Sequence, residues 1–395
     1  MYCFLLVVFW SSVFILCYSY VGYAAILWLM VKIKEAVKGK QAWATVDDPP
    51  EVTLLVAAYN EKDYVDAKVK NSLELDYHKD RLKIVWVTDG SDDGTPELLR
   101  KYQEVTVYHR RERAGKIEAI NRGVKLSTTP IVFFSDANTM LSKESVRRIV
   151  HLFANPQVGC VSGEKRILNN EKDTAAGAGE GLYWKYESCL KSYDARLYSV
   201  VGAAGELFAI RRELFTEVEN DTLLDDFIIS LRIAMRGYVT QYDPNAYAYE
   251  TSSANIKEEL KRKVRIAAGG FQAIVRLAPL LNIFKYGILS FQYISHRVLR
   301  WTFAPLCLLL LLISNFMLSY QAGLFTCNFY SVIFWLQAFF YITALLGWFL
   351  ENRNIKLKIL FVPYYFFIMN LSVYLGLIRY MKKSQDVKWE RAKRR

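Results

Sequence analysis

Three short polar clusters in this sequence have residue types that could bind a cation or another ligand. They are Tyr59-Asn60-Glu61, Asp89-Gly90-Ser91 and Asp136-Ala137-Asn138. Carboxylate and amide oxygens are the ligands preferred by hard cations such as Mg²⁺ or Mn²⁺. Each cluster taken singly could also be an ordinary turn, because Asp, Asn, Gly and Ser are common in turns.

A pair of adjacent carboxylates, Asp225 and Asp226, could supply a catalytic base. They open a stretch in which Phe227, Leu231 and Ala234 have helical spacing. A carboxylate held beside a hydroxyl group can take up its proton during group transfer. Acidic residues also stabilise the first turn of a helix, but that role does not require two neighbouring carboxylates after an apolar pair.

Each of the three polar clusters follows a run that is rich in β-forming residues. Such runs occur at "EVTLLVAAY", "LKIVWVTDG", "EVTVYHR" and "TPIVFFSDA", and polar, helix-compatible stretches such as "NEKDYVDAKVKNSLEL" and "GTPELLRKYQ" separate them. This alternation predicts an α/β domain with a parallel sheet flanked by helices. Ligands bind such sheets at the carboxyl ends of the strands, so we expect the three clusters to converge at one edge.

The apolar residues gather at the two ends of the sequence. Met1–Val31 contains no charged residue and lacks the basic leader of a cleaved signal peptide, so residues 1–32 are predicted to be a membrane anchor. Region 301–380 is predicted to hold three further spanning helices, at Trp301–Tyr320, Phe329–Leu350 and Leu357–Ile378. We therefore expect an integral membrane protein of the cell inner or plasma membrane.

Charge suggests on which side of the membrane the central domain lies. The first span is followed by "KIKEAVKGK", which favours a cytoplasmic catalytic domain, and the six scattered cysteines without a C-x-x-C pair fit a reducing compartment. Three C-terminal spans would then place the basic tail, residues 381–395, outside, although its charge favours the inside. A re-entrant span and an exception to the charge rule are both left open.

Five motifs of the central region occur in a fixed order: "VAAYNE", "TDGSDDGT", "AGKIEAINRG", "FSDANT" and "LDDFIISLRIAMRGY". In this order the sequence resembles the family 2 inverting glycosyltransferases. The flanking spans resemble the polysaccharide-synthase branch, which includes hyaluronan, chitin, cellulose and poly-N-acetylglucosamine synthases. The resemblance implies a GT-A (Rossmann-like) nucleotide-sugar domain at residues 50–275, inserted between transmembrane helices, with an interfacial helix region at 276–300.

The resemblance also implies roles for individual residues. The donor nucleotide would be bound by Ala57, Tyr59, Glu61, Asp89 and Lys116, although Lys116 could instead be a solvated surface lysine. Asp136 would hold Mg²⁺ or Mn²⁺ in the D-x-D position, where Asn138 replaces the second Asp and can still ligate through its carbonyl oxygen. The cation would stabilise the leaving nucleoside diphosphate. Asp226 would be the base, and Asp225 would support it.

The segment "ELKRKVRIAAGG" stands where processive members of the family carry Q-x-x-R-W. Aligned on Arg265, it has Arg262 for the Gln and Ile266 for the Trp. Lys263 and Arg265 are expected to pair with the donor diphosphate, or else to form the solvated side of an interfacial helix. The missing Trp removes a ring on which an acceptor sugar could stack, which favours single addition over long processive synthesis.

Two further segments receive predictions. Ser199–Leu214 resembles the acceptor-side loop of the family, where small residues leave room for a sugar; a plain strand and turn is the alternative. The stretch "FKYGILSFQYISHRVLRW" reads as a helix at the membrane surface. His296 in this stretch is isolated in the sequence from other metal-type ligands, so we predict a structural role for it.

Together these features predict a membrane-embedded, metal-dependent inverting glycosyltransferase. It would move a sugar from a nucleotide-sugar, expected to be a UDP-sugar, to a polysaccharide or lipid-linked acceptor in exopolysaccharide or cell-surface glycan synthesis. One alternative is a non-processive enzyme acting on a lipid carrier or glycolipid. Another is a membrane-anchored nucleotide-binding regulator, which would use Asp89 but not Asp226. Nucleic-acid binding is not expected, because the basic runs behind the +12 charge include membrane flanks; accessory or export subunits are left open.

Overall fold

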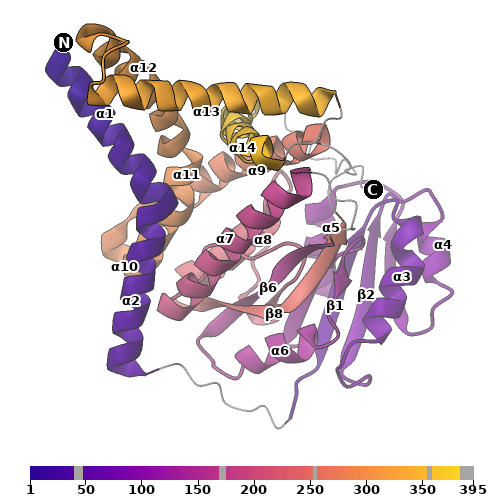
Figure 1. The fold of residues 1–395 in the computed structure, drawn as a ribbon. Coiled ribbons are helices and arrows are strands. Elements are labelled where there is room, and N and C mark those ends of the chain that lie inside the picture. The colour runs from indigo at the N-terminus through magenta and orange to yellow at the C-terminus, as the bar shows by residue number, and fades with distance from the viewer. Residues whose placement is uncertain (40–47, 169–174, 252–255, 354–357, 383–395) are drawn as a thin grey trace.

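A single mixed sheet forms the centre of the computed structural model, which describes residues 1–39, 48–168, 175–251, 256–353 and 358–382 (Figure 1). The sheet has eight strands in the order β3-β2-β1-β4-β7-β6-β8-β5. In chain order the strands are β1 Val52–Ala58, β2 Leu82–Asp89, β3 Val105–Arg110, β4 Ile131–Asp136, β5 Met140–Leu141, β6 Val158–Leu168, β7 Phe208–Arg211 and β8 Val239–Thr251. Most of the predicted basic tail lies outside the described residues.

The first four strands of the sheet order are parallel, as the sequence predicts. Every residue of β1 is buried, which fits a strand that is covered by helices on both faces. One face packs on α3 Lys62–Leu73, α4 Thr95–Leu99 and α6 Ser145–Leu152, and the other on α5 Lys116–Leu126 and α8 Asp225–Met235. The predicted α/β, Rossmann-like fold is confirmed.

The second half of the sheet departs from the expected parallel arrangement, because β7 runs antiparallel to both β4 and β6. The chain enters β7 from the loop around Gly205, which lies at the carboxyl ends of the parallel strands and contacts Asp226. A strand that starts at that edge must run in the opposite direction. The reversal therefore places the Ser199–Leu214 segment beside the predicted site.

The remaining helices connect the sheet to the apolar part of the chain. They are α7 Ala175–Leu197, α9 Ile256–Arg276, α10 Ile283–Tyr293 and α11 Leu299–Trp301, with 3₁₀ turns at Arg212–Leu214 and Ala278–Leu281 and a π-helical turn at Ile294–Val298. At the N-terminus α1 Tyr2–Cys17, a π-helical turn at Tyr18–Gly22 and α2 Tyr23–Lys38 follow one another directly. The C-terminal helices are α12 Phe303–Ala322, α13 Phe329–Asn352 and α14 Lys358–Met381.

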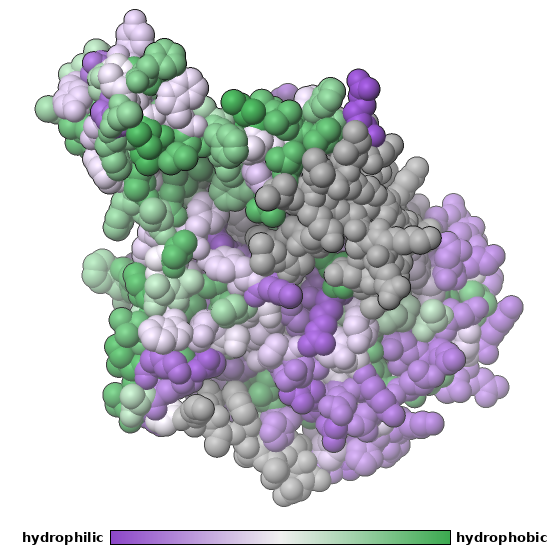
Figure 2. Space-filling model, in the orientation of Figure 1, coloured by the Kyte–Doolittle hydropathy of each residue, from purple (hydrophilic) through white to green (hydrophobic). Residues whose placement is uncertain are grey.

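Within the described residues, four helices are long and apolar enough to cross a membrane: Tyr2–Lys38, Phe303–Ala322, Phe329–Leu350 and Val362–Met381. Large apolar side chains such as Phe14, Trp28 and Phe339 are exposed on them. In Figure 2 hydrophobic side chains gather towards α1 and α2, and hydrophilic ones cover the opposite side near α3 and α4. The exposed apolar surface suits contact with lipid.

The last helix, α14, lies directly against α9 of the sheet-containing region. The ring of Tyr380 stacks on Phe271 with 6.5 Å between centroids. Gly376 lies so close to α9 that a Cβ atom there would come within 2.5 Å of the Ala267 Cβ. The apolar helices and the sheet domain are thus packed together.

Candidate active site

The carboxyl ends of β1, β2 and β4 meet at one edge of the sheet, as predicted. In the strand register Ala57 lies opposite Asp136 on one side and Val87 on the other. A small cavity at this edge is lined by residues from several elements, among them Ala57, Lys116, Asp136, Gly205 and Asp225. The structure therefore brings the cation-type cluster and the acidic pair to one place.

Asp89, at the end of β2, uses its two carboxylate oxygens differently. Its side chain is buried, and Oδ2 accepts hydrogen bonds from the backbone N–H groups of Ala114 at 2.9 Å and Gly115 at 2.6 Å. Oδ1 is also buried but has no hydrogen-bond partner within the part of the chain that the structure describes. Leaving a buried acceptor unsatisfied is costly, so this oxygen is available to a hydrogen-bond donor from outside the described residues.

The loop after β1 lies beside the loop after β2, because the Asn60 N–H donates to Ser91 Oγ at 3.1 Å. It holds Tyr59 and Glu61, two of the residues predicted to bind the nucleotide. The guanidinium of Arg113 stacks over the ring of Tyr59, 3.7 Å from its centroid. Glu61 is buried, and its backbone N–H donates to Thr95 Oγ1 at 3.0 Å. These contacts join the loop after β1 to the segment before α5 and to the start of α4.

Lys116, the first residue of α5, is not the solvated surface lysine that the sequence left open. Its Nζ lies 3.0 Å from Asp136 Oδ1 and 3.8 Å from Asp225 Oδ2. Burial by itself lowers the pKa of this ammonium, but Asp136 and Asp225 outweigh it and hold the pKa of Lys116 above its usual value. Lys116 therefore stays charged between the two carboxylates.

Asp136 and Asn138 lie on the short turn between β4 and β5, and the residues present fit a hard divalent cation. The carboxylate of Asp136 already faces one positive charge, and the partly exposed Asn138 offers a carbonyl oxygen on the same turn. Across the described residues no group of three or more His, Cys, Asp or Glu side chains could hold a metal. A cation here would take its remaining ligands from water and from a bound diphosphate, which is the usual arrangement for Mg²⁺.

Two residues of α3 that were not predicted from the sequence form hydrogen bonds with this turn. Lys68 is fully buried, and its Nζ donates to Ser135 Oγ and to the Thr139 carbonyl, both at 2.7 Å. Burial lowers the pKa of Lys68 to about 7, against the attraction of Asp136. Its position three residues after buried Val65 on the apolar face of the helix is the signal that could have revealed it.

The second of these residues, Asn71, fixes the far side of the turn. Its amide donates to the Leu141 carbonyl at 2.9 Å and accepts from the Leu141 N–H at 2.8 Å. Both ends of the turn are thus fastened to one helix, which limits how far Asp136 and Asn138 can move.

The acidic pair opens α8, as predicted, and its two members face different spaces. Asp225 lines the small cavity with Asp136, whereas Asp226 lines a much larger one. Burial, and then repulsion from Asp225, raise the pKa of Asp226 to about 7, although Lys116 opposes the shift. Gly205 leaves room beside it, since a Cβ there would lie 3.2 Å from Asp226 Oδ2. Asp226 can therefore accept a proton near neutral pH.

The larger cavity, of about 790 Å³, extends from Asp226 to α14. Its wall includes Trp184 and Trp301 as well as Ile266, the residue that replaces the Trp of the processive motif. Aromatic faces are good surfaces for apolar and stacking contacts. Rings are therefore present in this cavity even though the motif position lacks one.

The two cations expected at the diphosphate lie in different surroundings on α9. Arg265 is exposed and is close enough to Asp225, Asp136 and Asp226 to interact with their charges. Lys263 is buried, lies 3.7 Å from Glu259 Oε1 and lines the larger cavity. Arg265 is thus near the predicted metal site, whereas Lys263 faces the cavity that leads to α14.

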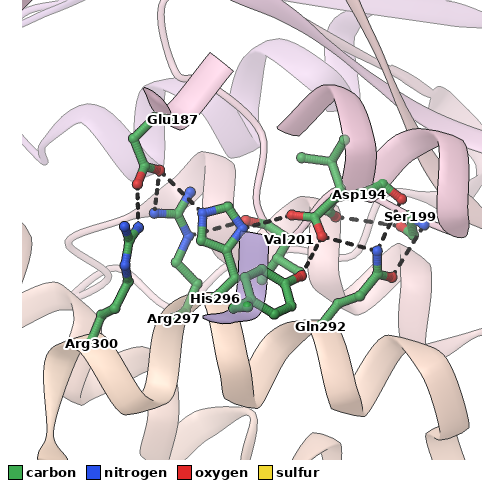
Figure 3. Close-up of polar contacts among 10 residues, drawn as sticks. Glu187, Asp194, Ser199, Val201, Gln292, His296, Arg297 and Arg300 are labelled. Carbon is green, nitrogen blue, oxygen red and sulfur yellow. Dashed lines mark hydrogen bonds and ion pairs between the residues drawn. The ribbon is translucent and has the colours of Figure 1, made fainter. Parts of the chain in front are cut away.

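His296 is isolated in the sequence but not in the structure (Figure 3). Its Nδ1 lies 2.6 Å from Asp194 Oδ2 and its Nε2 lies 3.3 Å from Glu187 Oε2, in a fully buried network. Glu187 also pairs with Arg300 and, at 3.1 Å, with Arg297. Burial opposes ionisation of Glu187, but these cations hold its pKa well below the usual range. Acidic side chains thus lie beside His296 in space, and the contacts, which join α7 to the helices before α12, are consistent with the structural role predicted for it.

Comparison with known proteins defines the class of enzyme. The family model "Glycosyltransferase like family 2" matches residues 49–269, and the chain belongs to this family. The predicted family and enzyme class are confirmed: the protein is a glycosyltransferase.

Among individual proteins, the chain is 28% identical over 239 residues to the poly-β-1,6-N-acetyl-D-glucosamine synthase of Staphylococcus aureus, over 58% of this chain and 57% of that protein. The chain therefore spans a little over half the length of this relative. The synthase of the same name from Staphylococcus epidermidis is 23% identical over 340 residues, which cover 82% of this chain and 81% of that protein.

A solved structure shares the fold. The mannosyltransferase PcManGT from Pyrobaculum calidifontis, in complex with GDP-Man and Mn²⁺, matches with a TM-score of 0.68 and 21% identity. The match covers 94% of this chain and 99% of that one. It confirms the GT-A fold predicted from the motifs.

Proposed function

We propose that this glycosyltransferase is membrane-embedded and metal-dependent, and that it transfers a sugar with inversion from a UDP-sugar to a growing glycan during exopolysaccharide synthesis. The observation that carries the proposal is the division of the acidic pair. Asp225 faces the small cavity with Asp136, while Asp226, with a pKa of about 7, faces the large cavity. A donor bound along the edge of the sheet beside Asp225 and an acceptor in the large cavity would meet at this pair.

Asp89 is proposed to recognise the nucleoside. Its buried Oδ1, which lacks a hydrogen-bond partner among the described residues, would accept from the N–H of uracil or from a ribose hydroxyl. Ala57, Tyr59 and Glu61 would form the surface around the nucleoside. The staphylococcal relatives are named for a polymer of N-acetylglucosamine, which makes an N-acetylglucosamine donor the first to test.

The reaction would proceed by one displacement at the anomeric carbon of the donor sugar. The acceptor oxygen forms the new bond and gives its proton to Asp226, while the bond from the anomeric carbon to the phosphate oxygen breaks. The bond electrons leave with the nucleoside diphosphate. A divalent cation held by Asp136 and Asn138 would supply Lewis-acid stabilisation of that leaving group. Lys116 and Arg265 add positive charge beside the same carboxylates.

The larger cavity is proposed to hold the acceptor glycan. Trp184 and Trp301 provide rings for sugar faces, which offsets the loss of the aromatic residue at Ile266 and supports addition to a polymer. A second candidate, transfer to a lipid-linked acceptor, is favoured by one observation: Val362, Phe366 and Met369 of the membrane helix α14 line this cavity. Membership of the glycosyltransferase family removes the regulator alternative.

The catalytic domain is proposed to lie on the cytoplasmic side. Lys34, in the basic end of α2, donates to the carbonyls of Arg196 and Leu197 at the end of α7, both at 2.8 Å. The basic flank of the first span is therefore on the same side as the catalytic domain. Basic flanks favour the cytoplasm.

The experiment that tests the proposal is release of nucleoside diphosphate by the detergent-purified full chain. UDP- and GDP-sugars would be offered with Mn²⁺ or Mg²⁺, with short oligosaccharides and membrane lipid as acceptors. We expect release from a UDP-sugar that requires the cation and disappears in Asp226→Asn. Sizing the product separates a polymer from a single addition to lipid. Metal-independent release, or release that survives Asp226→Asn, would contradict the proposal.

A further inference from the structure

One lysine on the wall of the large cavity has no partner in the part of the chain that the structure describes. Lys191, on α7, lines this cavity and is only 5% exposed. No hydrogen bond or ion pair joins its ammonium to another described residue. Burying a charge without a partner is costly. The ammonium of Lys191 is therefore available to an anionic group inside the cavity.

The charges around Lys191 do not replace such a partner. Burial lowers the pKa of this lysine, the attraction of Glu164 opposes the shift, and repulsion from Arg297 adds to it. Glu164 already accepts a hydrogen bond from the Tyr242 hydroxyl. Glu187 is paired with Arg297 at 3.1 Å, as Figure 3 shows. An anion bound beside Lys191 would supply the missing partner and stabilise its charged form.

The side chains that line the cavity carry an excess of positive charge. Six of them are lysine or arginine, and three are aspartate or glutamate. Among the six, Arg297 and Arg300 share a single carboxylate, that of Glu187. A cleft with an excess of one sign of charge attracts ligands of the opposite sign. The cavity as a whole therefore favours a ligand that brings negative charge.

The same cavity also has an apolar wall, which comes from α14. Val362, Phe366 and Met369 line it, and Val362–Met381 is long and apolar enough to cross a membrane. A ligand with an anionic group and apolar chains would match both parts of the wall. A lipid that carries a phosphate group has this composition.

We propose that the large cavity contains a binding site for the phosphate group of a lipid, and that Lys191 is the residue that binds this phosphate. A lysine ammonium forms short, charge-assisted hydrogen bonds with phosphate oxygens. The apolar chains of the lipid would lie against α14. The binding is inferred from the cavity alone, whereas its use, to hold a lipid-linked acceptor whose hydroxyl reaches Asp226, rests on the proposed function.

The test titrates the detergent-purified full chain with dioleoylphosphatidic acid, a phosphate group on two apolar chains, in mixed micelles while the Tm is followed. A ligand that binds the folded state raises the Tm as its concentration rises, and we expect a saturable rise in the wild type. Lys191→Met should bind this lipid roughly tenfold more weakly, the size expected for one hydrogen bond between charged groups. Lys191→Arg, which keeps the charge, should stay close to the wild type.

Two further ligands separate the phosphate from the chains that carry it. Dioleoylglycerol has the same chains without the phosphate, and inorganic phosphate has the group without the chains. We expect neither to raise the Tm in a way that depends on Lys191. An equal rise with dioleoylglycerol would overturn the inference, because the phosphate would then not matter. An equal, Lys191-dependent rise with inorganic phosphate would overturn the assignment to a lipid.

Lys285→Met is the matched control for general attraction between a basic protein and an anionic lipid. Lys285 is exposed on α10, in the predicted interfacial region, and lines neither the small nor the large cavity. Its removal deletes the same charge and should leave the lipid titration unchanged. Equal weakening in Lys191→Met and Lys285→Met would overturn the inference, because only net charge would then matter.

UDP distinguishes this site from the site of the donor nucleotide. Lys191→Met should bind UDP as tightly as the wild type does, since Lys191 is inferred to contact the lipid. If UDP binding weakens as much as lipid binding, Lys191 belongs to the donor diphosphate and the inference falls.

The inference and the proposed function can fail separately. Lys191-dependent lipid binding by a protein that releases no nucleoside diphosphate supports the lipid site while the proposed function fails. Transfer to an oligosaccharide, without lipid binding that depends on Lys191, overturns the inference and leaves the proposed function standing.

Discussion

The strand-end side of the site and the large cavity use charged residues in different ways. At the strand ends Asp89 keeps one buried oxygen without a partner among the described residues, and Asp226, where this side meets the large cavity, has a pKa raised to about 7. Along the cavity, several charged side chains are paired: Glu187 with Arg300, and Lys165 with Glu206 at 2.5 Å. Groups without partners are available to a ligand and a proton, whereas the ion pairs connect the elements that form the wall of the cavity. We therefore expect the sheet edge to carry out the reaction and the large cavity to position the acceptor.

The largest effect is expected from Asp226→Asn, which removes the proposed base from the boundary between the two sides. An amide cannot take up the acceptor proton, and loss of a general base typically costs about 10²–10⁴-fold in rate. We expect kcat for UDP release to fall by this amount while UDP affinity stays within about threefold, because Asp226 faces the acceptor cavity. Glu97→Gln, an exposed acidic residue that lines neither cavity, is the control. Full activity of Asp226→Asn would place the base elsewhere.

The next effect tests the paired wall. Glu187→Gln would leave the cations of Arg297 and Arg300 buried without their carboxylate. Breaking one partner of a buried ion pair typically costs about 3–5 kcal/mol in the free energy of unfolding. Thermal unfolding of the detergent-solubilised protein should show a clearly lower Tm, with UDP affinity preserved in the folded fraction. An unchanged Tm would mean that the wall does not depend on this pairing.

The dependence of the rate on pH tests the acidic pair, Asp225 and Asp226. The base must be deprotonated, so kcat/KM should be low below the pKa of Asp226 and rise with pH through about 7. Asp225 is the charge that raises this pKa most after burial, so Asp225→Asn should move the rise to lower pH. A pH–rate profile of both proteins measures the shift. A profile of Asp225→Asn displaced to higher pH would contradict the assigned cause.

The smallest effect concerns the rings of the cavity. Trp184→Ala should raise KM for an oligosaccharide acceptor roughly three- to tenfold, the size expected for loss of one aromatic contact. The KM for the donor should stay the same, since Trp184 lines the acceptor cavity. Tyr59→Ala is the matched variant on the donor side, where the pattern should be reversed. Equal changes in both KM values would erase the functional distinction between the two sides.

The strand-end side could be predicted from sequence because local rules determine it. Buried apolar runs form the parallel strands, and such strands carry the residues after them to one edge of the sheet. Ala57 and Asp136 therefore came together as expected, and α8 begins at Asp225 as its spacing indicated. The α/β fold and the family are confirmed, while the roles of the site residues and the domain boundaries stay predictions. The direction of β7 could not be read, because it depends on where the preceding loop lies.

The cavity side could not be predicted, because its partners are far apart in the chain. Asp194 and Glu187 are separated from His296 by 102 and 109 residues, and no local pattern links them. Lys68 is an intermediate case. Its place on the apolar face of α3 could have been noticed, but its contacts with Ser135 and Thr139 are 67 and 71 residues away. Residues joined only by tertiary packing leave no periodic signal in the sequence.

The close contact between Gly376 of α14 and Ala267 of α9 has a consequence for the proposed membrane setting of the protein. A spanning helix changes its tilt with the thickness of the bilayer. Gly376 has no side chain and packs closely on the Ala267 Cβ, so a change in the tilt of α14 would move α9 as well. Arg265, two residues before Ala267, would then shift relative to the carboxylates at the sheet edge. Turnover should therefore depend on acyl-chain length in reconstituted vesicles, and Gly376→Leu should alter that dependence.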